Sequence, residues 1–350
     1  MQDYMLVGCT SFAVWGDESA DGEIIAGRNF DFYMGEDFAG RNIVLVERPD
    51  SGYAYVSVTW PGMTGVLSGM NEKGLTVSIN ASKLETPKMS ATPVSILAKE
   101  ILQYASDIEE AVCIARAAKT FVSESFLICS ASDGRAAVIE KTPSEMAVYD
   151  PAANDPDCCR VVCANHYQSD LFRDREENLA NLRESDSGHR FRRVEELLDS
   201  LGKIGPESAA LILRDRRGAG GKDIGMCNEL SINQLLAMHS VIFRPSARDI
   251  WVSTYPWQCG EFIRFRLDDI LDSPVPPYHR DSSKDIPEDI FLHSESFRNL
   301  LKFKRSSAGI RSAISSGTEI PEDSISAYIG LNPLYYNAYN LAGDYFLAKG

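Results

Sequence analysis

The chain is 350 residues long and acidic, with 50 Asp and Glu against 35 Lys and Arg and a formal net charge of −15. This charge argues against nucleic acid or an anionic membrane surface as the main partner, because both attract clustered Lys and Arg. No apolar run approaches the roughly 20 residues of a membrane span, and Met1–Gly8 lacks a signal-peptide pattern. The compartment stays open: the cytoplasm, or export by a signal outside this sequence.

Eight cysteines are too few in a chain of this length for a disulfide scaffold. Cys158, Cys159 and Cys163 lie close together in the sequence. They lack the paired spacing of a zinc site, and His166 is the one histidine nearby. We therefore expect no metal site.

β-Structure is predicted for the first 80 residues, where short runs of β-branched and aromatic residues alternate with turn residues. The predicted strands there are 11–15, 23–27, 43–47, 53–60, 65–69 and 75–80. Apolar residues at helical spacing follow in 93–105 and 108–118, the second after an N-cap signal at Ser106-Asp107.

The rest of the chain returns to strands and then changes in composition. Strands are predicted at 126–130, 136–140, 160–164, 239–243, 249–253 and 261–267, and helices at 188–198, 207–214 and about 290–303. Strands, then helices, then strands indicate a layered α+β fold, and there is no G-x-G-x-x-G motif for a dinucleotide. The Ser-rich residues 275–350 are predicted to form an appendage or an extra helical layer.

Cys9 follows Gly8 near the first predicted strand, and a lone cysteine in such a place is more often a small buried hydrophobe than a nucleophile. Arg28 and Asp31 follow within one predicted hairpin. A guanidinium near a thiol lowers the pKa of the thiol and favours the reactive thiolate, and an aspartate can orient an α-amine. A salt bridge in the turn is the alternative interpretation of Arg28 and Asp31.

These residues stand in motifs that resemble a known superfamily. The segments Gly8-Cys9-Thr10-Ser11-Phe12 and Gly27-Arg28-Asn29-Phe30-Asp31-Phe32 resemble the choloylglycine hydrolases, which are N-terminal-nucleophile (Ntn) enzymes. The pattern is most similar to the acyl-coenzyme A:6-aminopenicillanate acyltransferase branch, in which a Gly-Cys bond is cleaved autocatalytically. Acid ceramidase and N-acylethanolamine amidase share similar motifs. The resemblance continues in segments 60–69, 74–80, 164–167 and 187–193.

The resemblance implies that self-cleavage before Cys9 frees its α-amine, which then acts as the base for its own thiol. A catalytic histidine is therefore not needed. Asp31 would hold the α-amine, and Arg28 would stabilise the thiolate.

The remaining implied residues surround the developing oxyanion. Asn165 would donate its side-chain amide, with a backbone N–H near Asn80 and Ala81 as the second donor. Arg190 would anchor this network. Arg175 competes for that role, because the ceramidase branch places its arginine closer to this position.

The family implies a four-layered αββα sandwich with two mostly antiparallel sheets. We expect this domain at 9–274, after a pro-segment at 1–8 that is naturally short or truncated, and before a C-terminal extension at 275–350. The implied reaction is cleavage of a linear carbon–nitrogen amide bond through a Cys9 thioester, by hydrolysis or acyl transfer. The implied substrate is a small N-acyl amide, without metal or organic cofactor.

Several alternatives stay open. Peptide-like or β-lactam side chains, bile-salt conjugates and lipid amides, as in a ceramidase-like lipid amidase, compete as substrates. Aromatic residues such as Phe30 and Trp60 fit an apolar acyl pocket or ordinary core packing. A non-enzymatic binding protein that retains the fold is the alternative of another class, and a papain-like protease lacks its C-G-[SA]-C-[WY] segment and a histidine partner. A homo-oligomer is compatible with the sequence.

Overall fold

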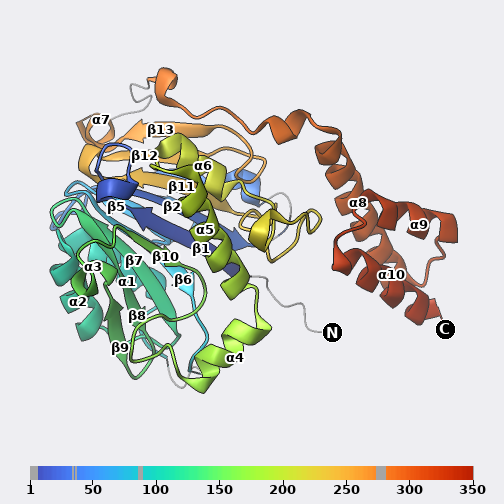
Figure 1. Cartoon of the computed structure of the whole chain (residues 1–350), viewed down its shortest axis with the longest axis horizontal. Coiled ribbons are helices and arrows are strands. Elements are labelled where there is room, and N and C mark those ends of the chain that lie inside the picture. The colour runs from blue at the N-terminus through green and yellow to red at the C-terminus, as the bar shows by residue number, and fades with distance from the viewer. Residues whose placement is uncertain (1–6, 34, 36–37, 86–89, 273–280, 350) are drawn as a thin grey trace.

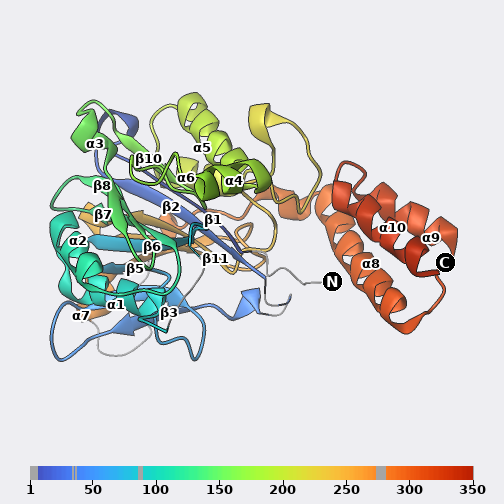
Figure 2. The ribbon, with the colours of Figure 1, turned by 90° about the horizontal axis from the view of Figure 1, so that it is seen from below.

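The structure is a computed structural model that describes residues 7–33, 35, 38–85, 90–272 and 281–349. Two antiparallel sheets stack face to face, and helices cover their outer faces (Figures 1 and 2). This arrangement confirms the predicted α+β class and its four layers.

The first sheet has six strands in the order β10-β1-β2-β11-β12-β13. Their bounds are β1 Val7–Val14, β2 Ile25–Phe32, β10 Arg160–Cys163, β11 His239–Arg244, β12 Asp249–Ser253 and β13 Phe262–Arg266. β1 and β2 pair over their whole length, from Val7 opposite Phe32 to Val14 opposite Ile25. Both strands extend beyond the predicted ranges, and the additional residues carry Cys9, Arg28 and Asp31.

The second sheet is a meander of seven strands, each paired with the next along the chain. Their bounds are β3 Ile43–Glu47, β4 Tyr55–Thr59, β5 Ser68–Asn71, β6 Leu75–Ala81, β7 Glu124–Ser130, β8 Arg135–Lys141 and β9 Met146–Tyr149. β5 starts later than predicted, and β9 was not predicted.

Each sheet has one face toward the other sheet and one toward helices. Ala13 of β1 packs in the core between the sheets with Val56 and Leu127, whereas its neighbours Phe12 and Val14 face the helices. This alternation follows from the two-residue period of a strand. The outer helices are α1 Val94–Tyr104 and α2 Ile108–Ala117 on the second sheet, and α5 Ser187–Leu201 and α6 Pro206–Leu213 on the first.

Local signals fixed some helix ends as expected. Asp107 caps α2, because its side chain accepts a hydrogen bond from the Glu110 backbone N–H at 2.9 Å. The helices α3 Pro151–Asn154, α4 Glu176–Glu184 and α7 Leu267–Asp272 are among those that were not predicted. None of the helices in the described part of the chain combines the length and the apolar character of a membrane span.

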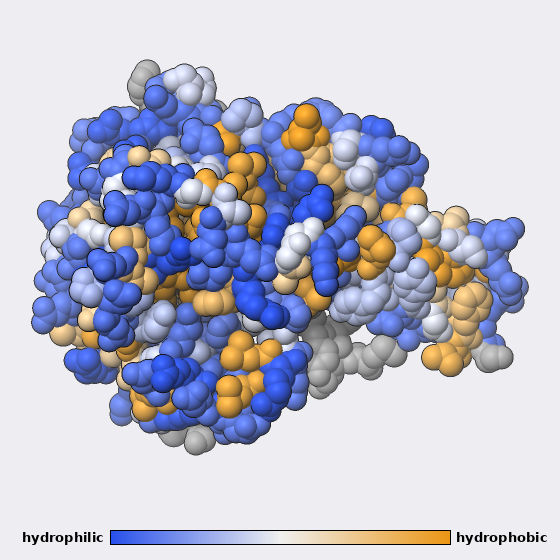
Figure 3. Space-filling model, in the orientation of Figure 1, coloured by the Kyte–Doolittle hydropathy of each residue, from blue (hydrophilic) through white to orange (hydrophobic). Residues whose placement is uncertain are grey.

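Three C-terminal helices, α8 Glu295–Ser316, α9 Glu322–Leu331 and α10 Tyr336–Lys349, project from one end of the sandwich (Figures 1 and 2). They pack around a core of their own, which includes Phe303, Tyr328 and Leu341. Apolar side chains also gather on their outer surface (Figure 3). The predicted boundary near residue 274 lies outside the described residues, so the domain division stays a prediction.

Candidate active site

Cys9 lies in β1 just before β10 begins to pair with this strand at Ser11. On its other side Cys9 is paired with Phe30 of β2. The strand alternation places its side chain, like that of Ala13, on the face toward the second sheet. Cys9 is 1% exposed in this intact chain. Of the predicted pro-segment, residues 1–6 lie outside the described residues, and Val7 and Gly8 begin β1.

Arg28 is the charged group in contact with the thiol. Its Nη2 lies 3.6 Å from Cys9 Sγ and also donates to the Ile79 carbonyl. Its Nη1 donates to Ser68 Oγ at 2.5 Å and lies 3.3 Å from His239 Nε2. The guanidinium is therefore held from both sheets, and its position beside the sulfur is fixed.

Burial nevertheless raises the pKa of the Cys9 thiol, and the nearby Arg28 charge lowers it only in part. The effect of Arg28 on the thiol pKa has the predicted direction, and the thiolate expected in the self-cleaved chain stays a prediction. Burial disfavours the charged form of any thiol, and here that penalty exceeds the attraction of the guanidinium.

Asp31 lies on the opposite face of the sheet, opposite Gly8 in the β1–β2 register. Its side chain is buried, and neither carboxylate oxygen has a hydrogen-bond partner among the described residues. Burial raises the pKa of Asp31 to about 7, against a lowering effect of Arg190. The carboxylate thus lies beside the Gly8–Cys9 segment without a cationic partner in direct contact.

Asn165 and Arg190 hold the main chain of Cys9. The Cys9 N–H donates to Asn165 Oδ1 at 3.0 Å. Asn165 follows the end of β10, so its side chain binds β1 at a point beyond the paired residues of β10. Arg190 Nη1 donates to the Cys9 carbonyl at 2.5 Å and to Thr10 Oγ1 at 2.7 Å, and its Nη2 donates to Asn165 Oδ1 at 2.6 Å. These contacts hold β1 at the N–H and at the carbonyl of Cys9.

Arg190 is the arginine that reaches this site. It is fully buried in α5, whereas Arg175 is half-exposed and pairs with Glu145 at 2.5 Å. The structure therefore separates the two candidates by position. The catalytic role of Arg190 stays a prediction.

The two asparagine amides both bind main-chain carbonyls in the intact chain. Asn165 Nδ2 donates to the Ala81 carbonyl at 2.7 Å. Asn80 Nδ2 donates to the Cys163 and Ala164 carbonyls at 2.9 and 3.1 Å. Asn165 Nδ2 has a second N–H besides the one that it gives to Ala81, and its predicted donation to the oxyanion stays a prediction. The second predicted donor, a backbone N–H near Asn80 and Ala81, stays a prediction too.

Sequence reasoning missed His239 and Ser68. His239 is buried on β11, and its Nε2 lies 2.9 Å from Ser68 Oγ and close to Arg28. Burial, and then the Arg28 charge, lowers the pKa of His239 well below its usual value, so the ring is neutral. Ser68 lies within the 60–69 segment, but no role was assigned to it there, and His239 lies outside the motifs. Ser68 reaches Arg28 from the second sheet, and His239 reaches it from β11, which pairs with β2 in the same sheet.

His166 does not reach the sulfur through any contact described. Its Nδ1 lies 2.7 Å from Ser187 Oγ, which also accepts a hydrogen bond from the Asn165 backbone N–H at 2.8 Å. Its ring packs against Phe191 at 5.2 Å. Burial and the Arg190 charge lower the pKa of His166 to about 4. It supports the Asn165 segment as a neutral group.

Glu124, at the start of β7, is a further residue that the sequence did not reveal. Its Oε2 is buried without a hydrogen-bond partner among the described residues. Burial raises the pKa of Glu124 to about 8, although the Arg28 charge lowers it. A neutral carboxyl near the thiol at physiological pH follows from this burial.

Replacing Glu124 by Gln tests this protonation state through stability. A carboxyl whose pKa rises from 4.5 to about 8 on folding holds its proton more tightly in the folded chain, so the free energy of unfolding falls as pH rises through that window. We expect the free energy of unfolding of Glu124→Gln to equal that of the wild type at pH 5 and to be roughly 1–3 kcal/mol higher at pH 9. Urea unfolding at both pH values measures this, with the exposed-helix variant Glu109→Gln as control. Equal pH dependence in wild type and Glu124→Gln would contradict it.

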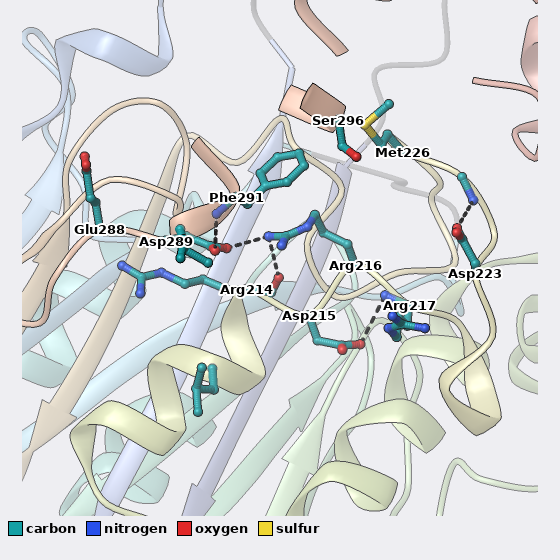
Figure 4. A pocket seen from close by; sticks show the side chains of 13 residues that line it. Arg214, Asp215, Arg216, Arg217, Asp223, Met226, Glu288, Asp289, Phe291 and Ser296 are labelled. Carbon is teal, nitrogen blue, oxygen red and sulfur yellow. Dashed lines mark hydrogen bonds and ion pairs between the residues drawn. The ribbon is translucent and has the colours of Figure 1, made fainter. Parts of the chain in front are cut away.

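Cys9 does not line either of two cavities that are well defined in the described part of the chain. One, of about 530 Å³, lies between residues 211–226 and 288–296 (Figure 4). Its charged groups are largely paired, as in the 2.6 Å contact of Arg216 with Asp289. The other lies between α8 and α9. No group of three or more potential metal ligands occurs in the residues that the structure describes.

The chain matches the family of acyl-coenzyme A:6-aminopenicillanic acid acyl-transferases over residues 18–254. This stretch begins after Cys9 and contains the other five predicted site residues. A curated relative from Archaeoglobus fulgidus, described as uncharacterized, is 28% identical over 187 residues, which is 47% of this chain and 31% of the relative. The chain thus spans about a third of that relative's length.

Two solved structures share the fold. A mutant of conjugated bile acid hydrolase from Clostridium perfringens, with its cysteine at position 2 replaced by alanine, has a TM-score of 0.50 at 16% identity, over 78% of this chain and 97% of that one. Penicillin V acylase from Agrobacterium tumefaciens has a TM-score of 0.50 at 15% identity, over 74% and 86%. Because the family match covers more than half of the 350 residues, this chain belongs to the acyl-coenzyme A:6-aminopenicillanic acid acyl-transferase family of Ntn-hydrolase fold.

Proposed function

We propose that the chain is a self-processing cysteine Ntn amidohydrolase or acyltransferase that cleaves a linear amide bond of a small N-acyl amide through a Cys9 thioester. The observation that carries this proposal is the 3.6 Å contact between Arg28 Nη2 and Cys9 Sγ. Asn165 and Arg190 support it, because they hold the Cys9 main chain at the same point. Family membership supports amide chemistry in general.

The first reaction is self-cleavage. Cys9 Sγ attacks the Gly8 carbonyl carbon, the Gly8–Cys9 C–N bond breaks, and the thiol proton passes to the departing Cys9 nitrogen. The resulting thioester is hydrolysed by water, which leaves a carboxylate on Gly8 and restores the thiol. Cys9 now carries a free α-amine next to its own sulfur.

That α-amine supplies the base that the intact chain lacks. The ordinary pKa of an α-amine is about 8, so this group accepts the thiol proton at neutral pH. Asp31 then gains a cationic partner on the side where Gly8 was paired with it. Departure of residues up to Gly8 would also expose the sulfur, which is buried in the intact chain.

Turnover then follows the same chemistry on a substrate. The thiolate attacks the amide carbonyl, the α-ammonium group gives its proton to the leaving amine, and a thioester forms. Water or another amine attacks this thioester and restores the thiol. Arg28 stabilises the thiolate in each cycle.

The surroundings of Cys9 favour an apolar acyl group. Phe30 and Met238 are buried against Cys9, and Phe32, Phe38 and Trp60 pack around them. The Phe30 and Trp60 rings are stacked with centroids 6.4 Å apart. Such a surface buries an acyl chain or aromatic side chain, so N-acyl amides with an apolar acyl part are the substrates to test first.

Mass spectrometry of the purified chain tests the first step. We expect a product that begins at Cys9, and Cys9 labelling by a thiol-directed acylating probe in this product but not in the intact chain. The exposed Cys113 is the internal control, because it should react in both forms. An intact Gly8–Cys9 bond in a preparation that hydrolyses N-acyl amides would refute self-cleavage.

A further inference from the structure

Gly8, on the acyl side of the Gly8–Cys9 bond, lies between two buried side chains. A Cβ at Gly8 would lie 2.7 Å from Gln234 Nε2 and 3.6 Å from Asp31 Cβ. Non-bonded heavy atoms pack best at about 3.5–4.0 Å, so the first of these distances is a collision. Any side chain at position 8 therefore requires Gln234 to move.

Gln234 has little freedom to move. It is 1% exposed, and the residues on both sides of it are held by hydrogen bonds. The Asn233 N–H donates to the Asp215 carbonyl at 2.8 Å, and the Leu235 N–H donates to Asn233 Oδ1 at 2.9 Å. A buried side chain on a fixed backbone in a closely packed interior has few other conformations.

The Gln234 amide is also unusual in its hydrogen bonding. Its Nε2 is buried and has no hydrogen-bond partner in the described part of the chain. Native proteins keep few such groups, and each one calls for a reason. The distance of 2.7 Å between this amide nitrogen and the Cβ position of Gly8 places the amide near the acyl side of the bond that the proposed self-cleavage breaks.

We propose that Gln234 is a positioning residue for self-cleavage, which restricts position 8 to glycine and fixes the acyl side of the Gly8–Cys9 bond for attack by Sγ. This inference rests on the proposed self-cleavage. Asn165 and Arg190 hold the Cys9 side of the same bond. Gln234 thus positions the Gly8 side of the bond. It takes no part in proton transfer.

The test is a pair of substitutions measured separately and together. The wild type, Gly8→Ala, Gln234→Ala and the double variant are made by cell-free synthesis, and the fraction cleaved is followed over time by mass spectrometry. We expect Gly8→Ala to slow cleavage about tenfold or more, as overpacking of a closed interior does. The double variant should be cleaved about tenfold faster than Gly8→Ala, because the new methyl group has room once the Gln234 side chain is removed. Gln234→Ala alone should slow cleavage severalfold.

Two matched variants serve as controls. A Cβ at Gly205 meets no atom closer than 3.7 Å, so Gly205→Ala should cleave at the wild-type rate. Gln258 is a buried glutamine outside the site, so Gln258→Ala reports the cost of losing such a side chain. Thermal unfolding shows which variants are folded. If Gln234→Ala is not folded, Gln234→Ser takes its place in the single and double variants.

The outcomes separate this inference from the proposed function. A wild-type chain that stays intact overturns self-cleavage itself. A wild-type chain that is cleaved, with folded Gly8→Ala cleaved equally fast or not rescued by the change at Gln234, overturns only the role of Gln234. Rescue in the double variant, without any effect of the control variants, supports it.

Discussion

Cys9→Ala is expected to abolish both self-cleavage and amide hydrolysis, with a loss of roughly 10⁴-fold or more in rate. No other group described near the site can replace a sulfur that acts as nucleophile in both reactions. The measurements are the mass of the chain and the release of free amine from a panel of N-acyl amides.

Cys129→Ala is the matched control for Cys9→Ala. Cys129 is also a buried free cysteine, but it packs in the core between the sheets. Its replacement should leave cleavage and turnover near the wild-type level once folding is verified by thermal unfolding. Amine release by folded Cys9→Ala at the wild-type rate would refute the proposed enzyme mechanism. Cleaved wild type that turns over no N-acyl amide would favour a binding protein instead.

Arg28→Met is expected to lower kcat/KM about 10²–10³-fold, because the thiolate loses the positive charge at 3.6 Å. The pKa of the Cys9 thiol should rise, since Arg28 is the largest of the groups that lower it. The pH dependence of Cys9 alkylation by iodoacetamide measures this in chains that begin at Cys9, which separates catalysis from processing. Methionine keeps the length of the side chain without its charge.

The control for Arg28→Met is Arg175→Met. Arg175 lies at the surface, pairs with Glu145 and also stacks over Phe172. Exposed pairs of this kind contribute about 0–1 kcal/mol, so activity and the thiol pKa should stay near wild type. An unchanged alkylation profile in folded Arg28→Met would show that Arg28 does not tune the sulfur.

The sequence predicted the hairpin that carries Cys9, Arg28 and Asp31, because these residues are local and their strands pair with each other. It did not predict how far β1 and β2 extend, and this extra length is what aligns Cys9 with Phe30 and Gly8 with Asp31. Strand ends depend on neighbours in the sheet, which a single sequence does not contain.

The partners of that hairpin come from distant parts of the chain. Asn165 lies 156 residues after Cys9, and His239 lies 211 residues after Arg28. The resemblance named Asn165 and Arg190 by motif. Ser68 lies within the 60–69 segment but was given no role, and His239, Glu124 and Gln234 lie outside the motifs. Their positions follow from strand order, from the stacking of the two sheets and from the loop before β11.

What the sequence determined by itself was the α+β class, the family motifs and the candidate nucleophile, because strand periodicity and short motifs are properties of neighbouring residues. Only the tertiary structure decided the protonation of the site. Burial raises the pKa values of Cys9, Asp31 and Glu124 and lowers that of His239. Burial depends on what packs over a group, and in this chain the packing comes from two sheets whose strands are far apart in sequence.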